Sequence, residues 1–277
     1  MSPRAKSRTQ KSGRSSVRTD RALVLKRSAY GESSLVLRLV TPRHGAAAVI
    51  AKGAYRPKSA FCGVFDLFDT LEVTWTPARH GGLGQASAAR VVTRRRALTA
   101  DLARYRAALA MLELVDLAAQ PGHAETELFA LVEGWLTVLA EGAITPELAL
   151  VAFDLAFLQN LGLAPAFDTC AACGVAAPTA ARRSPAQART VPFAIGAGGR
   201  LCDRCAHDAQ ASGRRVGALP MNVLRIATSV AAAKPRELAR FRLSPELLAQ
   251  VATWVQRFLD YHLETRPRSR AARTLHA

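Results

Sequence analysis

Four cysteines in two closely spaced pairs constrain this chain more than any other feature. Two residues separate Cys170 from Cys173 and Cys202 from Cys205, and Gly174 follows the first pair. This spacing lets both sulfurs of a pair bind one ion while the backbone turns between them, and four thiolates complete a closed tetrahedral zinc site. Because no coordination position stays open, we expect Zn²⁺ to be structural. Two redox-active CxxC motifs, or disulfides in a secreted protein, are the alternatives.

The segment between the two cysteine pairs is longer than in a usual zinc ribbon. It contains Pro178, Pro185 and Pro192 and a run of glycine and alanine at 196–199, which predict loops or a short hairpin. A metal ion would hold the two ends of this segment together. We therefore predict a zinc module over residues 165–217.

Length and hydrophobic content are typical of a folded intracellular protein. The 277 residues, 49% of them hydrophobic, suffice for a substantial core and two or three domains. No apolar run reaches the roughly 18 residues of a membrane span, and no signal-peptide core follows the basic start. We expect a cytoplasmic, nucleoid-associated protein. Its thiols would stay reduced, which favours metal over disulfides and leaves Cys62 as a small core residue.

Charge is divided unevenly along the chain. The net charge is +17, yet residues 98–170 carry a net −8 between basic segments. A uniform basic excess could reflect the abundance of arginine alone, whereas an acidic block inside it indicates partition by function. A basic surface favours a polyanion as partner, and nucleic acid rather than membrane because no basic amphipathic helix stands out.

The first third of the chain predicts a basic arm and a small β-barrel. Residues 1–21 are basic, rich in serine and without apolar periodicity, which is typical of a disordered arm. Residues 22–97 contain five short β-rich runs separated by turn residues. An OB-fold is one such barrel and binds single-stranded nucleic acid, while a Greek-key or SH3-like barrel is the alternative. The predicted strands are 22–27, 33–40, 46–52, 65–75 and 83–92.

One connection of this barrel combines cations with an aromatic ring. Lys52, Arg56 and Lys58 lie around Tyr55 in a segment that glycine and proline punctuate. Cations neutralise phosphates, and a tyrosine ring can stack on a base. We therefore predict that these four residues line a nucleic-acid path, with a solvated turn in which Tyr55 packs inward as the alternative.

Other arginines are predicted to extend this path. One lies on the second strand, three are consecutive at the end of the barrel, and two belong to the zinc module. They are Arg38, Arg94, Arg95, Arg96, Arg182 and Arg183. Several phosphate contacts would make the affinity for nucleic acid fall steeply with salt concentration.

Residues 98–277 are predicted to form a helical domain into which the zinc module is inserted. Thr145 and Ser244 each precede a proline at the first position of a helix, and Thr99 is a further candidate N-cap. Each of the helices that follow carries an apolar stripe, which we expect to pack as the core of a bundle. The chain is therefore predicted to belong to the α+β class.

No sequence motif indicates catalysis. The HExxH, GxSxG, GxxxxGK[ST] and GxGxxG patterns are missing from the sequence. Asp66 and Glu72 fall on one face of a predicted strand and Asp69 on the other, so they do not form a metal-nuclease cluster. We expect a binding protein that is not an enzyme.

Several segments together resemble the RecO family of bacterial DNA recombination and repair proteins. They are 22–25, 30–32, Ser34, 41–42, Gly45, 52–53, 56–59, 161–162, Pro165, 170–174, 202–205, 261–263 and 268–270. These segments span nearly the whole chain after residue 21 and follow the order of the family. The basic arm departs from the family pattern.

The resemblance implies an N-terminal OB-fold and a helical domain with a zinc module. It implies a non-enzymatic mediator that binds single- and double-stranded DNA, anneals complementary strands and, with RecR, helps to load RecA onto strands coated by single-stranded DNA-binding protein. In the family, the helical domain contacts the acidic C-terminal tail of single-stranded DNA-binding protein. Some members lack the cysteines, so zinc is not needed for the family activity.

Two other classes of protein fit parts of the sequence. A zinc-ribbon transcription or RNA-binding factor would prefer one duplex sequence or an RNA and would not anneal strands. A thiol oxidoreductase would be free of zinc and would have a reactive cysteine of low pKa.

Overall fold

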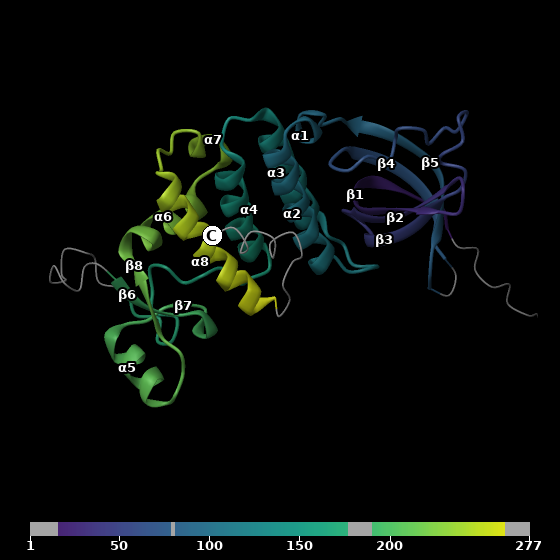
Figure 1. Ribbon diagram of the computed structural model, residues 1–277. Coiled ribbons are helices and arrows are strands. Elements are labelled where there is room, and N and C mark those ends of the chain that lie inside the picture. The colour runs from purple at the N-terminus through teal and green to yellow at the C-terminus, as the bar shows by residue number, and fades with distance from the viewer. Residues whose placement is uncertain (1–15, 79–80, 177–189, 264–277) are drawn as a thin grey trace, which may run out of the picture.

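The computed structural model describes residues 16–78, 81–176 and 190–263. A β-barrel lies at one end of the molecule, helices occupy the middle, and a small module with three short strands lies at the other end (Figure 1). The barrel and the module are therefore separated by the helical domain.

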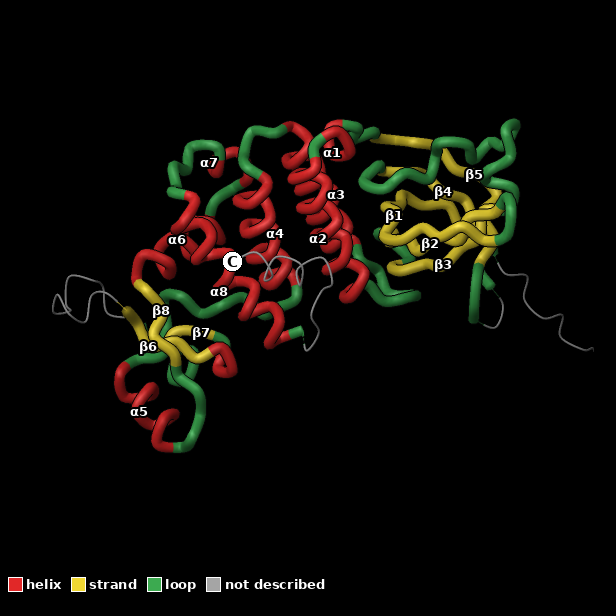
Figure 2. The backbone as a smooth tube through the Cα atoms, in the orientation of Figure 1, coloured by secondary structure: helices red, strands yellow, loops and turns green. Residues whose placement is uncertain are grey.

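The barrel consists of five strands that close on themselves (Figure 2). The strands are β1 Arg18–Tyr30, β2 Ser34–Thr41, β3 Gly45–Ala51, β4 Thr70–Thr76 and β5 Gly84–Thr93. Their order is β1-β2-β3-β5-β4, and β4 pairs again with β1. β3 and β5 are parallel, while the other pairs are antiparallel. This order is of the OB type, which confirms the predicted barrel.

β1 starts earlier than the sequence indicates. It begins at Arg18, so the last residues of the predicted arm 1–21 belong to the barrel. Asp20 is buried there and accepts a hydrogen bond from the backbone N–H of Arg43 at 3.0 Å. A strand with charged residues at its start shows little hydrophobic alternation, which explains why the predicted boundary was late.

β4 is shorter than predicted because residues 65–69 fold as a cap over the barrel. Phe65 and Phe68 are buried, and Phe68 has a left-handed backbone with φ of 72°, which a strand does not accommodate, so β4 begins only at Thr70. The ring of Phe68 meets that of Tyr105 at 5.4 Å in an edge-to-face arrangement. This cap joins the barrel to the first long helix.

The helical domain contains seven helices among the described residues. They are α1 Ala97–Ala100, α2 Leu102–Ala118, α3 Thr126–Glu141, α4 Pro146–Asn160, α6 Met221–Ala232, α7 Pro235–Leu238 and α8 Pro245–His262. The hydroxyl of Thr145 accepts the N–H of Leu148 and that of Ser244 accepts the N–H of Leu247, each at 3.3 Å, which confirms both predicted caps. The cap predicted at Thr99 was wrong.

Asp101 takes the place predicted for Thr99. Its carboxylate accepts the N–H of Arg104 at 2.8 Å and begins α2, while Thr99 lies within the short α1. A carboxylate both accepts the hydrogen bond and complements the positive end of the helix dipole.

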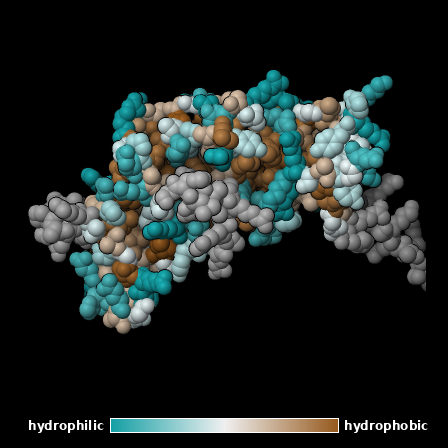
Figure 3. All heavy atoms as spheres, viewed as in Figure 1, coloured by the Kyte–Doolittle hydropathy of each residue, from teal (hydrophilic) through white to brown (hydrophobic). Residues whose placement is uncertain are grey.

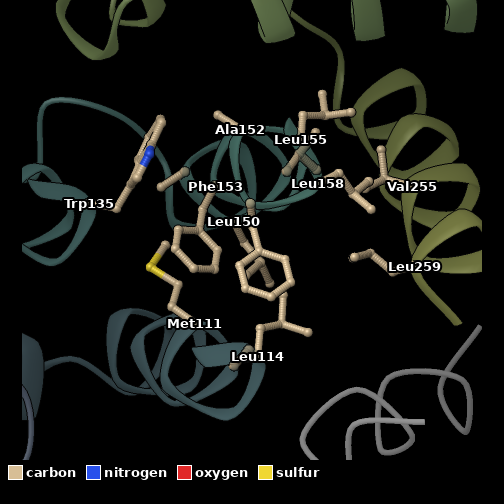
Figure 4. Close-up of a cluster of buried hydrophobic side chains, with 14 of the residues drawn as sticks. Met111, Leu114, Trp135, Leu150, Ala152, Phe153, Leu155, Leu158, Val255 and Leu259 are labelled. Carbon is tan, nitrogen blue, oxygen red and sulfur yellow. The ribbon is translucent and has the colours of Figure 1, made fainter. Parts of the chain in front are cut away.

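α4 is the central helix of the domain. Side chains of α2, α3 and α8 converge on it (Figure 4). Besides the predicted stripe, Leu150, Ala152 and Phe153 are also buried. The helix is therefore buried on almost every side, as expected of a helix enclosed by others, and Asp154 is the one charged residue among its buried positions.

The module is an insertion between α4 and α6. It comprises β6 Thr190–Ala194, β7 Gly199–Arg200, α5 Asp203–Ala211 and β8 Gly217–Pro220, and its sheet has the order β7-β6-β8. β6 and β7 form the predicted short hairpin. The module rests on α8 through aromatic rings, since Phe193 meets Trp254 at 5.3 Å and Phe167 meets it at 5.7 Å.

Opposite charges hold the barrel against the helices. Asp116 of α2 forms ion pairs with Lys26 and Arg38 of the barrel. Glu133 of α3 pairs with Arg21 of β1. Part of the acidic block in the sequence therefore pairs with cations of the barrel at the interface between the two domains.

Hydrophobic side chains are most visible over the helical half of the face shown in Figure 3, between hydrophilic ones. Within the described residues, no helix combines the length and apolar character needed to cross a membrane.

Candidate metal centre and nucleic-acid interface

The four paired cysteines converge on one point. The sulfurs of Cys170, Cys173, Cys202 and Cys205 all lie within 4.8 Å of one another, and those of Cys173 and Cys202 are 3.9 Å apart. Sulfurs around a tetrahedral Zn²⁺ lie about 3.8 Å apart, given a Zn–S bond of about 2.3 Å. A disulfide needs about 2.05 Å. The separation therefore fits four ligands around one metal ion.

Local backbone geometry builds each half of this cluster. After the first pair, Gly174 adopts φ of 72° and donates its N–H to the carbonyl of Cys170 at 2.8 Å. The second pair begins α5, where Cys202 is the N-cap and its sulfur accepts the N–H of Cys205 at 3.5 Å. The N–H of Cys202 donates to the sulfur of Cys170 at 3.3 Å and connects the two halves.

The protonation chemistry of the cluster favours a bound cation. Burial acts to raise the pKa of Cys170, but hydrogen bonds, first among them the one from the backbone N–H of Cys202, lower this pKa to about 6. The side chains of Cys202 and Cys173 raise the pKa of Cys205 to about 12. The four sulfurs therefore cannot all ionise near neutral pH without a positive charge between them, and a thiophilic metal ion supplies that charge.

A close backbone contact positions the first cysteine pair against the second. The carbonyl of Ala166 accepts the N–H of Arg200 at 2.9 Å, and the carbonyl of Arg200 accepts the N–H of Ala171 at 2.8 Å. A Cβ atom on Gly199 would lie 2.6 Å from the Cβ of Ala166. Glycine at position 199 is therefore needed for the strand to approach this closely.

The predicted cationic connection forms an ordered surface at one end of the barrel. We call Lys52, Tyr55, Arg56 and Lys58 the barrel-end surface, and all four are exposed. The N–H of Tyr55 donates to the carbonyl of Ser33 at 2.9 Å. The segment is therefore tied to the turn between β1 and β2.

Two turns and one buried residue fix the conformation of this segment. The N–H of Arg56 donates to the carbonyl of Gly53 at 3.0 Å, and the N–H of Ser59 to that of Arg56 at 2.9 Å. Ala54 is buried beneath them in the barrel core. Because Tyr55 is 56% exposed, the inward packing considered as the alternative is not observed.

The cations of the barrel-end surface are available to a ligand. In the part of the chain that the structure describes, Lys52, Arg56 and Lys58 form no ion pair. By contrast, Arg27 pairs with Asp66 at 2.7 Å and Arg90 with Glu72 at 2.8 Å. The three free cations are therefore concentrated where the sequence predicts a nucleic-acid path.

The other predicted contacts do not all join this surface. The guanidinium of Arg95 is buried and bonds to the carbonyl of Phe68 at 2.7 Å, so the prediction of a phosphate contact there was wrong. Arg38 lies in the interface with α2, where it forms an ion pair with Asp116, which also pairs with Lys26. A residue pattern cannot reveal such pairing, because Asp116 lies far away in the sequence.

The remaining arginines have different environments. Arg94 is near the barrel-end connection, with its side chain 3.2 Å from the carbonyl of Gly63, and it faces the carboxylate of Asp69 at 3.7 Å. Arg96 is exposed. Arg182 and Arg183 lie outside the described residues. The described part of their module is at the far end of the helical domain from the barrel (Figure 1).

Two residues near the barrel-end surface differ from expectation. Cys62 is exposed and is not the core residue expected. Tyr30 is the last residue of β1, is 60% exposed and directly precedes the turn to which Tyr55 is bonded. It was not identified from the sequence as a candidate site residue. Its position just before a glycine-containing turn was the available signal.

The fold and the cysteine cluster together define a class: a protein with an OB-type barrel whose helical domain carries a four-cysteine metal-binding module. Family models agree with this division of the chain. The model described as "Recombination protein O N terminal" matches residues 16–95, and the one described as "Recombination protein O C terminal" matches residues 99–271.

Individual relatives agree as well. The DNA repair protein RecO of Myxococcus xanthus strain DK1622 is 32% identical over 250 residues, which cover 90% of this chain and 94% of the relative. The DNA repair protein RecO of Thermobifida fusca strain YX is 29% identical over 257 residues, which cover 90% and 95%. The chain belongs to the RecO family, which assigns it a role in DNA repair and recombination.

Proposed function

We propose that this chain is a non-enzymatic DNA-binding mediator that anneals complementary strands and, with RecR, helps to load recombinase onto strands coated by single-stranded DNA-binding protein. The observation that carries the proposal is the barrel-end surface, where three free cations and an exposed tyrosine stand on one fixed segment. Family membership supports the same reading.

Annealing requires no reacting group. Two single strands repel each other through their phosphates, and a protein that neutralises both lowers that repulsion. Lys52, Arg56 and Lys58 would supply this charge, and Tyr55 would hold a base by stacking. Arg94, whose side chain reaches the carbonyl of Gly63, and the exposed Arg96 would extend the contact.

We propose Zn²⁺ as the ion of the cysteine cluster, with a structural role. Four thiolates are the ligand set that structural zinc sites use, and they leave no open coordination position. Cys170, Cys173, Cys202 and Cys205 would hold the ion and so keep β7 and α5 in place.

An annealing assay tests the proposal. Complementary strands coated with single-stranded DNA-binding protein are mixed with and without this protein across a salt series. We expect faster annealing with the protein, weakening as salt rises. The double variant Arg56→Glu/Lys58→Glu should lower affinity for single strands and reduce the slope of log K against log salt by about 1.4, for two lost phosphate contacts.

A matched variant separates local from overall charge. Arg236→Glu/Arg240→Glu changes the net charge by the same amount at two exposed residues of the helical domain and should change affinity much less. If both double variants lost affinity equally, the barrel-end surface would not be the binding site. Tight binding without annealing would instead favour a transcription or RNA-binding factor.

A further inference from the structure

We infer that Tyr30 and Tyr55 form a paired base-stacking surface that makes the barrel end selective for single strands over duplex DNA. This inference rests on the proposed function and adds to it both a residue and a strand preference. Nothing in the cation pattern alone would distinguish the two forms of DNA, since both carry phosphates.

The two tyrosines belong to segments that are bonded together. Tyr30 pairs with Ser34 across the turn between β1 and β2, and Ser33 of that turn accepts the N–H of Tyr55 at 2.9 Å. Leu35 pairs with Ala51, just before the barrel-end segment begins. Both tyrosines are therefore fixed at the same end of the barrel by main-chain contacts.

Exposure of both rings points to a ligand with flat apolar faces. The exposed fractions are 60% for Tyr30 and 56% for Tyr55, although both residues adjoin a well-packed barrel core. Bases in a single strand can unstack and place their faces on aromatic rings, whereas bases in a duplex are already stacked on one another. A surface of two such rings therefore favours single strands.

Charge around the rings sets the orientation of the strand. Lys52, Arg56 and Lys58 flank Tyr55 in its segment and are exposed, while Glu32 is exposed in the turn that follows Tyr30. Phosphates are attracted to the first side and repelled from the second. The backbone of the strand would therefore follow residues 52–58, and its bases would turn toward Tyr30.

Binding of labelled oligonucleotides to the full chain tests this inference. Tyr30→Ala and Tyr55→Ala should each weaken binding of a single strand by roughly 5- to 150-fold and leave duplex affinity within about twofold. Tyr30→Phe and Tyr55→Phe keep the ring and should bind as the wild type does. On an abasic strand of equal length, which offers phosphates without bases, all these variants should bind equally.

The outcomes separate this inference from the proposed function. Two results would overturn the stacking role even if Arg56→Glu/Lys58→Glu weakened binding. One is an equal loss of affinity for single strand and duplex in the alanine variants; the other is no loss of affinity in either alanine variant. If that charge-reversed variant also bound normally, the placement of DNA on the barrel end would fail first. If an alanine variant had a lower melting temperature while the matching phenylalanine variant did not, the ring would act through packing. The alanine variant would then also bind the abasic strand more weakly, which would overturn the stacking role.

Discussion

Arg94, Arg95 and Arg96 are consecutive in the sequence but have three different environments. Arg94 faces carboxylates at the surface, Arg95 is 5% exposed, and Arg96 is exposed. Nothing in a run of three identical residues distinguishes them. The difference arises because the chain passes from β5 into α1 at this point, and the turn directs one of the three side chains between the barrel and α3.

Arg95 connects the two domains, so its removal should lower stability. Its guanidinium bonds to the hydroxyls of Thr70 and Thr137, each at 3.0 Å, besides the carbonyl of Phe68. Arg95→Ala removes these hydrogen bonds, takes away the partner of the buried Phe68 carbonyl and should lower the free energy of unfolding by about 3 kcal/mol. Urea unfolding measures this loss.

Arg96→Ala is the matched control, since it removes the same side chain from an exposed position. It should change the free energy of unfolding by about 0.5 kcal/mol or less. Equal effects of the two substitutions would contradict the bridging role of Arg95.

Asp69 should make stability depend on pH. Burial raises the pKa of this carboxyl. The hydrogen bond from the N–H of Arg95 and the charge of Arg94 act to lower the pKa, but burial is the larger effect. The folded state then binds the proton more tightly than the unfolded state, so the ionised carboxylate costs stability at neutral pH, and this cost disappears as the pH falls through the folded pKa.

Asp69→Asn keeps the accepting oxygen and removes the charge. We expect the variant to be more stable than the wild type at pH 7 and this advantage to shrink as the pH is lowered toward 4. Urea unfolding of both proteins across that range gives the difference. An advantage that stayed constant or grew on acidification would show that burial does not control this carboxyl.

At the scale of elements, the sequence predicts best where one local interaction determines the structure. The caps at Thr145 and Ser244 and the turn at Gly174 each depend on residues within a few positions. The cysteine cluster was predictable because two CxxC pairs have the spacing that a shared metal ion requires. The cap at Phe68 and the all-round burial of α4 depend on which elements pack together, and no local pattern encodes that.

The close approach at Gly199 gives a prediction for the module. Gly199→Ala places a methyl group 2.6 Å from the Cβ of Ala166 and 2.7 Å from its carbonyl oxygen. The strand must move, so the first cysteine pair shifts against the second. We expect weaker metal retention, measured as the metal bound per chain after dialysis against a competing chelator.

Gly134→Ala is the control for this substitution. Gly134 lies inside α3, and a Cβ atom there would meet nothing within 4 Å. This change should leave metal content unaltered and raise stability by roughly 0.5–1 kcal/mol, because alanine favours a helix more than glycine does. Equal metal retention in the two variants would show that the contact at Gly199 does not position the ligands.

At the scale of the whole molecule, the metal site and the barrel-end surface lie at opposite ends (Figure 1). We therefore expect metal loss to leave DNA binding at the barrel largely intact. Cys173→Ser should abolish stoichiometric metal binding and unfold the module, seen as a lost low-temperature transition in calorimetry. Single-strand affinity should fall by less than about threefold, because the helical domain lies between the barrel and the module (Figure 1).

Cys62→Ser is the matched control, since Cys62 is the one described cysteine outside the cluster. Metal content and the calorimetric transitions should be those of the wild type. A large loss of DNA affinity in Cys173→Ser alone would show that the module takes part in binding.

The division of charge also acquires a structural meaning at this scale. Sequence analysis indicated that an acidic block between basic segments separates functions, and the structure shows that Asp116 and Glu133 of this block attach the helices to the barrel. Each of the three barrel cations at this interface has an acidic partner, with Asp116 shared by two of them. By contrast, Lys52, Arg56 and Lys58 of the barrel-end surface have no acidic partner within the described residues.

The enclosed position of α4 has a consequence for exchange with solvent. Its backbone amides are shielded by α2, α3 and α8 on all sides, so hydrogen–deuterium exchange at residues such as Leu155 requires the helices around it to separate. The exchange rates of the slowest amides of α4, measured in buffer without denaturant, should therefore give the free energy of opening the whole helical domain. A single peptide from this helix, followed by mass spectrometry, would measure this free energy without any denaturant.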